Sequence, residues 1–262
     1  MTGQTTSQRP RLVLIHGWAQ HAGIWQVWRD RLAPIADMTA VDLPGHGGKP
    51  WKNAIRSLDA LADSVLPALE QPAALCGWSL GGMIAMNLAR RHPLRVTRLV
   101  LCNTTPRFVA GHDWIHAVQP SLVEGFRRRV SENPERVLRD FLSLQLRGES
   151  DSRQTLTLLR SALTEQNRPR AAALEFTLSL LAQTDLRDEL AAIAPPTLVI
   201  ASDADAITPL AAGEYLARQL PDARLLTVTG CGHAGFLSRP ERLSPGIDEF
   251  LGGESAQEMA SQ

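Results

Sequence analysis

The stretch Gly77-Trp78-Ser79-Leu80-Gly81 stands between a short apolar run, 73–77, and a pattern of helical apolar spacing, 80–91. A G-x-S-x-G sequence in a strand–turn–helix context is typical of a nucleophile elbow, where a serine occupies a tight turn and small neighbours leave room for the backbone. The start of the following helix stabilises negative charge that develops near the serine. The stretch therefore predicts Ser79 as a nucleophile on an α/β sheet.

The same alternation extends along the chain on both sides of this stretch. Five further apolar runs have the length expected of buried parallel strands, and helical patterns fill the gaps between them. Strands that alternate with helices predict an α/β fold, with a mostly parallel sheet flanked by helices and right-handed crossovers. The five runs are 12–15, 38–41, 98–102, 197–201 and 224–228, and the main further helices are expected at 57–69, 211–219 and 241–250.

The alternation stops between residues 107 and 190. This segment shows helical spacing and no strand pattern, as in Val123, Phe126 and Val130. We therefore expect a helical lid, 107–190, inserted between two strands of a core formed by 11–106 and 191–251. The polar ends, 1–10 and 252–262, are expected to be flexible.

Composition excludes several classes of protein. The 262 residues include 27 Lys+Arg and 27 Asp+Glu, and a neutral chain argues against nucleic acid or an anionic membrane as the main partner. No apolar stretch approaches the length of a membrane helix or a secretory signal. The three cysteines, at 76, 102 and 231, have unrelated spacings, which fit neither a disulfide framework nor a zinc site. We expect a cytoplasmic monomer with no metal or cofactor.

The charge is unevenly distributed. Residues 120–170 contain ten arginines and seven acidic residues, a net charge of +3 in a neutral chain. Only Lys49 and Lys52 are lysines, so 25 of the 27 cations are arginines. Two explanations remain open: a solvated helical face combined with a codon bias, or a surface for an acidic partner, for which the planar guanidinium is well suited.

A catalytic serine needs a base and an acid, which follow it along the chain in this type of fold. His233 is the one histidine far downstream, and it lies in a glycine-rich loop after the last predicted strand. The acid should follow the strand 197–201, where Asp203 and Asp205 both stand. We choose Asp205 to orient the imidazole and leave Asp203 as the alternative.

An oxyanion hole requires two backbone N–H groups. Leu80, directly after the serine, and Trp18, in the loop after the first strand, are the expected donors. The side chains of Trp18, Trp78 and Leu80 would then line an apolar acyl pocket. Packing in the core is the alternative for the two tryptophans.

Four motifs in this order resemble those of the α/β-hydrolase superfamily, and the resemblance covers residues 11–251. It implies the α/β-hydrolase fold and a triad of Ser79, Asp205 and His233. The four motifs are Leu14-Ile15-His16-Gly17-Trp18, Asp42-Leu43-Pro44-Gly45-His46-Gly47, Gly77-Trp78-Ser79-Leu80-Gly81-Gly82 and Gly232-His233.

A narrower set of residues, Trp18, Trp78, Gly81-Gly82 and Phe141-Leu142-Ser143-Leu144-Gln145, resembles the BioH-type esterases of biotin synthesis. That family hydrolyses the methyl ester of pimeloyl-acyl-carrier protein to pimeloyl-acyl-carrier protein and methanol. The resemblance implies an acyl-enzyme mechanism without a cofactor, and a cavity lined partly by Phe141.

The same family docks an acidic carrier protein on lid arginines. Arg136 and Arg153 match that pattern, which makes them the expected docking residues. Asp140 and Thr157 stand where the family has further arginines, and the nearby Arg139 and Arg160 are expected to replace those. The stretch before residue 11 is also too short for the two leading strands of the superfamily, so we expect fewer strands at that edge.

Other functions stay open on the same scaffold. A general short-acyl carboxylesterase, a lactonase and a carbon–carbon bond hydrolase share the triad, and the lid decides between them. A ligand receptor without catalysis is a further alternative, because a fold does not fix a function.

Overall fold

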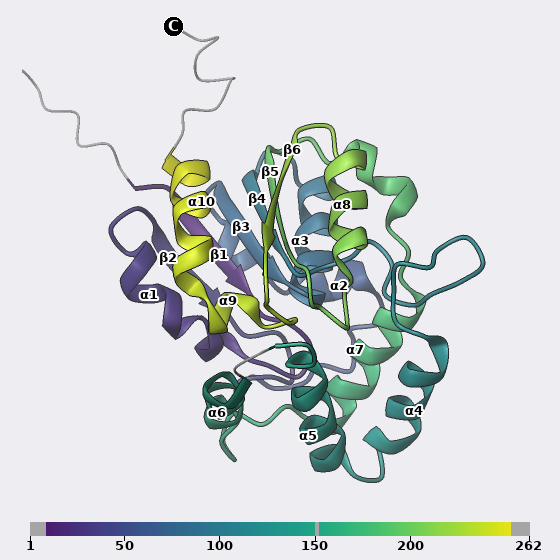
Figure 1. Cartoon of the computed structure of the whole chain (residues 1–262). Helices are drawn as coiled ribbons and strands as arrows, with labels where there is room; N and C mark the ends of the chain where they lie inside the picture. The colour runs from purple at the N-terminus through teal and green to yellow at the C-terminus, as the bar shows by residue number, and fades with distance from the viewer. Residues whose placement is uncertain (1–8, 150–151, 253–262) are drawn as a thin grey trace, which may run out of the picture.

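The computed structural model describes residues 9–149 and 152–252 and contains a six-stranded sheet (Figure 1). The strand order is β2-β1-β3-β4-β5-β6, and all five pairings are parallel. The six strands lie within two residues of the predicted bounds, and in the described part of the chain no strand precedes β1. The strands are β1 (Arg11–Ile15), β2 (Asp37–Val41), β3 (Ala73–Trp78), β4 (Val96–Cys102), β5 (Thr197–Ser202) and β6 (Ala223–Val228).

Each inner strand sends alternate side chains to the two faces of the sheet, as the pleat requires. In β1, Val13 and Ile15 join one hydrophobic cluster, whereas Leu12 and Leu14 join the other. Two layers of helices cover these faces (Figure 1). One layer contains α2 (Leu58–Asp63), α3 (Leu80–Arg91) and α8 (Leu210–Gln219), and the other contains α1 (Gln26–Leu32), α9 (Gly235–Ser238) and α10 (Pro240–Gly252).

The helix predicted over 57–69 is two separate elements, so that expectation of a single helix is wrong. The chain forms α2, which Ser57 caps at the N-terminus, and then a 3₁₀ turn, η2 (Leu66–Leu69). Pro67 lacks the N–H that a continuous helix would require. The Ser64 hydroxyl also donates to the Leu61 carbonyl at 2.6 Å, at the end of α2.

Four helices separate β4 from β5 and form the helical insertion, α4 to α7. They lie at the edge of the sheet formed by the carboxyl ends of the parallel strands (Figure 1). Trp18, just after β1, donates its indole N–H to the Leu174 carbonyl in α7 at 3.2 Å. The helices are α4 (Pro120–Val130), α5 (Pro134–Gln145), α6 (Ser152–Ala162) and α7 (Ala171–Gln183), and a short 3₁₀ element, η3 (Arg187–Ala192), follows them.

The first part of the predicted lid is not helical. Between β4 and α4 the chain forms a loop that isolated bridges hold, including Val109 with Val118 and Arg107 with Asp185. Across residues 9–149 and 152–252, no helix combines the length and the apolar composition needed to cross a membrane.

Candidate active site

Ser79 occupies a strained turn between β3 and α3. Its φ of 56° and ψ of −119° are rare for a residue with a side chain, and such strain is concentrated at functional sites. The flanking glycines make the turn possible, because a Cβ on Gly77 would collide with the carbonyl of Gly81 and one on Gly81 with that of Ile15. The spacing of the motif is therefore a steric requirement of the turn.

Hydrogen bonds from β4 and the residues after it hold the turn in place. The Ser79 N–H donates to the Cys102 carbonyl at 3.0 Å, and the Thr104 hydroxyl donates to the Ser79 carbonyl at 2.6 Å. Ser79 is only 5% exposed. The nucleophile is thus fixed from the neighbouring strand as well as by its own helix.

His233 and Asp205 meet although they are 28 residues apart, and the ring of His233 lies 5.5 Å from that of Trp78, the residue before Ser79. The Nδ1 atom of His233 lies 2.8 Å from Oδ2 of Asp205, and both side chains are buried. A carboxylate only accepts hydrogen bonds, so Nδ1 carries the proton and Nε2 is the basic nitrogen. Among the described residues, His233 Nε2 has no hydrogen-bond partner. It is therefore available to a serine or a substrate proton.

The environment of Asp205 favours its charged form. Burial by itself would raise the pKa of Asp205, but the nearby His233 and the donors of Thr208 hold the pKa below its usual range. The Thr208 hydroxyl donates to Oδ2 at 2.6 Å, and the backbone N–H groups of Ile207 and Thr208 donate to Oδ1 at 2.8 and 2.9 Å. Asn103 donates to Oδ2 at 2.8 Å.

Asp203, the alternative acid, lies elsewhere. It is exposed and accepts the N–H of Gly230 at 2.7 Å, which fixes the turn after β6. The two candidate acids therefore have different environments. Asp205 faces the imidazole of His233, and Asp203 stabilises a surface turn.

The loop after β1 passes directly over the nucleophile. A Cβ on Gly17 would lie 3.2 Å from the Cβ of Ser79, so this loop, in which Trp18 is the next residue, runs against the serine. His16 orders this loop, since its Nδ1–H donates to the Gly17 carbonyl at 2.8 Å and its Nε2 accepts the Leu43 N–H at 3.0 Å. Leu80 is the first residue of α3, where N–H groups lack a helical partner.

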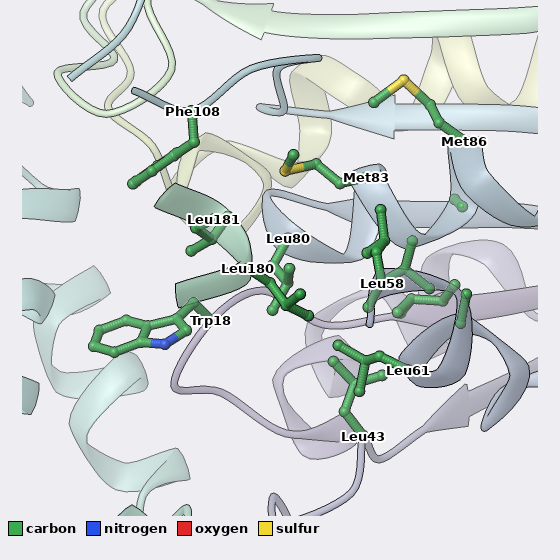
Figure 2. Packing of buried hydrophobic residues seen from close by; sticks show 14 of the residues in the cluster. Trp18, Leu43, Leu58, Leu61, Leu80, Met83, Met86, Phe108, Leu180 and Leu181 are labelled. Atoms are coloured by element: carbon green, nitrogen blue, oxygen red, sulfur yellow. The ribbon is translucent and has the colours of Figure 1, made fainter. Parts of the chain in front are cut away.

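An apolar cavity lies between the core and the helical insertion. Its volume is about 10 Å³, and its walls are apolar throughout. Figure 2 shows Trp18, Phe108 and Leu181 at one end of the larger hydrophobic cluster, with Leu58 and Leu61 at the other. The rings of Trp18 and Phe141 pack edge to face, 4.7 Å apart. The lining residues are Trp18, Phe108, Val118, Leu122, Val123, Phe126, Phe141, Leu144, Leu178, Leu181 and Ile207.

Trp78 and Leu80, which we expected in the pocket, are not among these lining residues. Trp78 packs on the opposite face of the sheet, 4.7 Å from the ring of Phe236, and its indole N–H donates to the His233 carbonyl at 3.0 Å. The alternation of β3 explains this, because Trp78 faces the same side as Ala74 and Cys76. Trp78 therefore holds the loop that carries His233 from the face of the sheet opposite to the cavity.

Two buried glutamines near the candidate site have side-chain amides without a partner among the described residues, and the sequence pattern assigned neither of them a role. Gln20, two residues after Trp18, and Gln145, at the end of α5, are each at most 1% exposed. Within the described chain neither side-chain amide has a hydrogen-bond partner. The Gln145 carbonyl accepts the His233 N–H at 2.9 Å, which connects α5 to the histidine loop. Gln145 belongs to the 141–145 stretch, but nothing in the pattern indicated Gln20.

The four arginines expected to dock a carrier lie on α5 and α6. Arg136, Arg139, Arg153 and Arg160 are all exposed, and none forms an ion pair with another described residue. In the described part of the helical insertion, three other arginines form ion pairs, Arg127 with Glu124, Arg129 with Asp140 and Arg168 with Glu135. Within residues 9–149 and 152–252, no group of three or more His, Cys, Asp or Glu side chains could hold a metal ion.

A family model, curated relatives and a solved structure all match this chain over nearly its whole length. The sequence profile of the alpha/beta hydrolase fold matches residues 10–240. The pimeloyl-acyl-carrier-protein methyl ester esterase of Aromatoleum aromaticum is 42% identical, covering 94% of this chain and 99% of that one, and that of Nitrosomonas europaea is 38% identical over 91% and 94%. An esterase structure from Exiguobacterium antarcticum superposes with a TM-score of 0.84 at 20% identity, covering 93% and 92%, a similarity of fold alone.

Proposed function

Because the chain belongs to the alpha/beta hydrolase fold family and, within it, to the pimeloyl-acyl-carrier-protein methyl ester esterases, we propose that it hydrolyses the methyl ester of pimeloyl-acyl-carrier protein. This reaction belongs to biotin synthesis. The protein is a carboxylic ester hydrolase. The observation that carries the proposal is the 2.8 Å hydrogen bond between His233 and Asp205 beside the strained Ser79, in a chain that spans 99% of a relative with this activity in its name.

The reaction proceeds through an acyl-enzyme. Ser79 Oγ attacks the ester carbonyl carbon while His233 Nε2 takes the hydroxyl proton. The N–H groups of Trp18 and Leu80 stabilise the oxyanion of the tetrahedral intermediate. When the carbon–oxygen bond of the methyl ester breaks, His233 gives its proton to the departing methanol. Water then attacks the acyl-enzyme with His233 as the base, which releases the carboxylic acid and restores Ser79.

The acyl chain is proposed to occupy the apolar cavity lined by Trp18 and Phe141. The cavity of about 10 Å³ holds roughly one water molecule, which is much less than a seven-carbon chain needs. Binding of the acyl chain therefore requires the side chains that line the cavity, or the helices that carry them, to move apart. A chain of methylene groups suits these apolar walls.

The carrier protein is proposed to dock on the outer face of α5 and α6. Arg136 and Arg153 match the docking pattern, and Arg139 and Arg160 add charge on the same helices. An acidic carrier neutralises guanidinium groups that have no ion pair with the described residues, which favours encounter more than final affinity. A monomeric state and a cytoplasmic location stay predictions from the sequence.

The decisive test compares substrates and a nucleophile variant. Purified protein is assayed with pimeloyl-acyl-carrier protein methyl ester, with free dimethyl pimelate and with nitrophenyl esters. We expect the highest kcat/KM on the carrier substrate, and Ser79→Ala should lose nearly all turnover on every ester while keeping its circular dichroism spectrum. Full activity of Ser79→Ala would refute the mechanism.

The other outcomes identify the alternatives. Preference for free short esters indicates a general carboxylesterase, and preference for lactones or dienones indicates a lactonase or a carbon–carbon bond hydrolase. Covalent labelling of Ser79 by a fluorophosphonate without turnover on any substrate indicates a receptor.

A further inference from the structure

Asn103 is a buried amide in contact with the acid of the candidate triad, and the sequence pattern did not single it out. It directly follows β4 and is 2% exposed. Its backbone has a φ of 43°, in the left-handed region that asparagine tolerates better than most residues. A buried polar side chain held on a strained backbone indicates a specific role rather than chance.

The position of Asn103 follows from the sheet. Its backbone N–H donates to the Ile200 carbonyl of β5 at 2.8 Å, so the residue is tied to the strand that precedes Asp205. The left-handed turn directs its side chain across the end of that strand, where Nδ2 lies 2.8 Å from Asp205 Oδ2. The contact is therefore set by two neighbouring strands.

The chemistry of the contact determines which end of the amide faces the acid. An ionised carboxylate accepts hydrogen bonds and donates none, so the NH₂ group must face Asp205. The Oδ1 atom of Asn103 then accepts from the Ser202 hydroxyl at 3.4 Å. Both polar atoms of this amide group have a partner, whereas the side-chain amide of Gln20 has none in the described part of the chain.

We propose that Asn103 is a positioning residue for Asp205, and this rests on the proposed esterase mechanism. Oδ2 of Asp205 also receives the His233 Nδ1–H and the Thr208 hydroxyl, and the Asn103 amide is the donor that comes from the end of the neighbouring strand, β4. It holds the carboxylate in the plane that aligns the imidazole and shares its negative charge. Asn103 does not touch the substrate.

Two substitutions separate this role from simple space filling. Asn103→Gly preserves the left-handed backbone and removes the donor without adding charge. Asn103→Asp preserves the shape but replaces the donor by an acid, which repels Asp205 when it is charged and can donate only when it is protonated. The proposal therefore predicts that Asn103→Asp is the more damaging change above neutral pH, whereas space filling predicts the reverse.

The experiment measures kcat and KM on a nitrophenyl ester between pH 6 and pH 9. We expect kcat of Asn103→Gly to fall about tenfold, as for the loss of one hydrogen bond to a charged group, with KM unchanged and a ratio to wild type that is constant with pH. For Asn103→Asp we expect a ratio to wild type that decreases as the pH rises. Asn87→Ala is the matched control, because Asn87 is also a buried amide that donates to a carboxylate, Asp59 at 2.7 Å, away from the triad.

Three results would overturn the proposal. They are wild-type kcat in both Asn103 variants, a ratio for Asn103→Asp that is independent of pH and higher than that of Asn103→Gly, or an equal loss of kcat in Asn87→Ala. Circular dichroism and thermal unfolding identify a variant that does not fold, and Asn103→Ser then provides a second removal of the amide. Ser79→Ala is assayed in parallel, since activity there refutes the esterase mechanism, whereas an inactive Ser79→Ala with unaffected Asn103 variants refutes only the role of Asn103.

Discussion

Asp205 receives five hydrogen bonds, two of them from backbone N–H groups at the start of the turn that follows it. These bonds offset the cost of burying a charge, which would otherwise shift the carboxyl group to its neutral form. The result is an acid that is charged, immobile and aimed at His233. The orientation of the base is therefore decided by residues that never meet the substrate.

The roles of the two aspartates can be separated by a matched pair of substitutions. Asp205→Asn should lower kcat by about 10³- to 10⁴-fold, because an amide favours the wrong imidazole tautomer and does not stabilise imidazolium. Asp203→Asn should leave kcat near the wild-type value, since Asp203 only braces the Gly230 turn. Steady-state kinetics on a nitrophenyl ester measures both. A large loss in Asp203→Asn and none in Asp205→Asn would reverse the assignment.

At the scale of single elements, α5 serves two surfaces at once. Its inner face places Phe141 against Trp18 in the cavity, and its last residue, Gln145, accepts the N–H of His233. Its outer face exposes Arg136 and Arg139. A partner that binds the outer face of α5 therefore contacts a helix that also lines the cavity and is hydrogen-bonded to His233.

The charge of α5 and α6 can be tested by reversing it. Arg136→Glu combined with Arg153→Glu should raise KM for the carrier-linked ester about tenfold at low salt, because encounter with an acidic protein depends on these charges. KM for a nitrophenyl ester should not change. Arg218→Glu, on α8 in the layer that covers the sheet, is the matched control.

Ionic strength gives an independent check of the same prediction. Raising the salt concentration should slow turnover of the carrier substrate by wild type and leave the small ester unaffected, since screening weakens exposed charges. Salt-independent turnover of the carrier substrate would contradict docking on these arginines.

At the scale of the whole molecule, two buried histidines make the fold sensitive to acid. The ring centroids of His16 and His46 lie 5.2 Å apart, and His16 belongs to the loop that carries Trp18. Burial lowers the pKa of His46 to about 4, and burial together with His46 lowers the pKa of His16. In the unfolded chain both groups titrate near 6.5. The unfolded state therefore binds protons first as the pH falls.

The free energy of unfolding should consequently decrease between pH 6.5 and pH 4, with His46 contributing up to about 3 kcal/mol of the loss. Urea titrations at a series of pH values measure it. His46→Asn should reduce the slope with pH, whereas His112→Asn should not, because His112 is 96% exposed. An identical slope in wild type and His46→Asn would contradict this account.

Local sequence determined most of the fold and part of the site. Strand bounds, the start of α3 at Leu80 and the elbow at Ser79 follow from apolar spacing and glycine positions, because short-range sterics decide them. The face that Trp78 occupies was equally readable from the alternation along β3, but the motif suggested a pocket instead. The break after Asp63 was missed because one helical pattern continued across it.

The remaining features depended on contacts between distant segments. Local periodicity and chain order were enough to predict the parallel sheet, a mainly helical segment between β4 and β5, Ser79 as the candidate nucleophile and His233 as its candidate base. Contacts between distant segments place Asp205, and not Asp203, against His233, and they surround Asp205 with Asn103 and Thr208. They also leave the side-chain amides of Gln20 and Gln145 without a partner among the described residues. Those features arise where the ends of separate strands and the end of α5 meet, and no local pattern encodes which side chains face one another there.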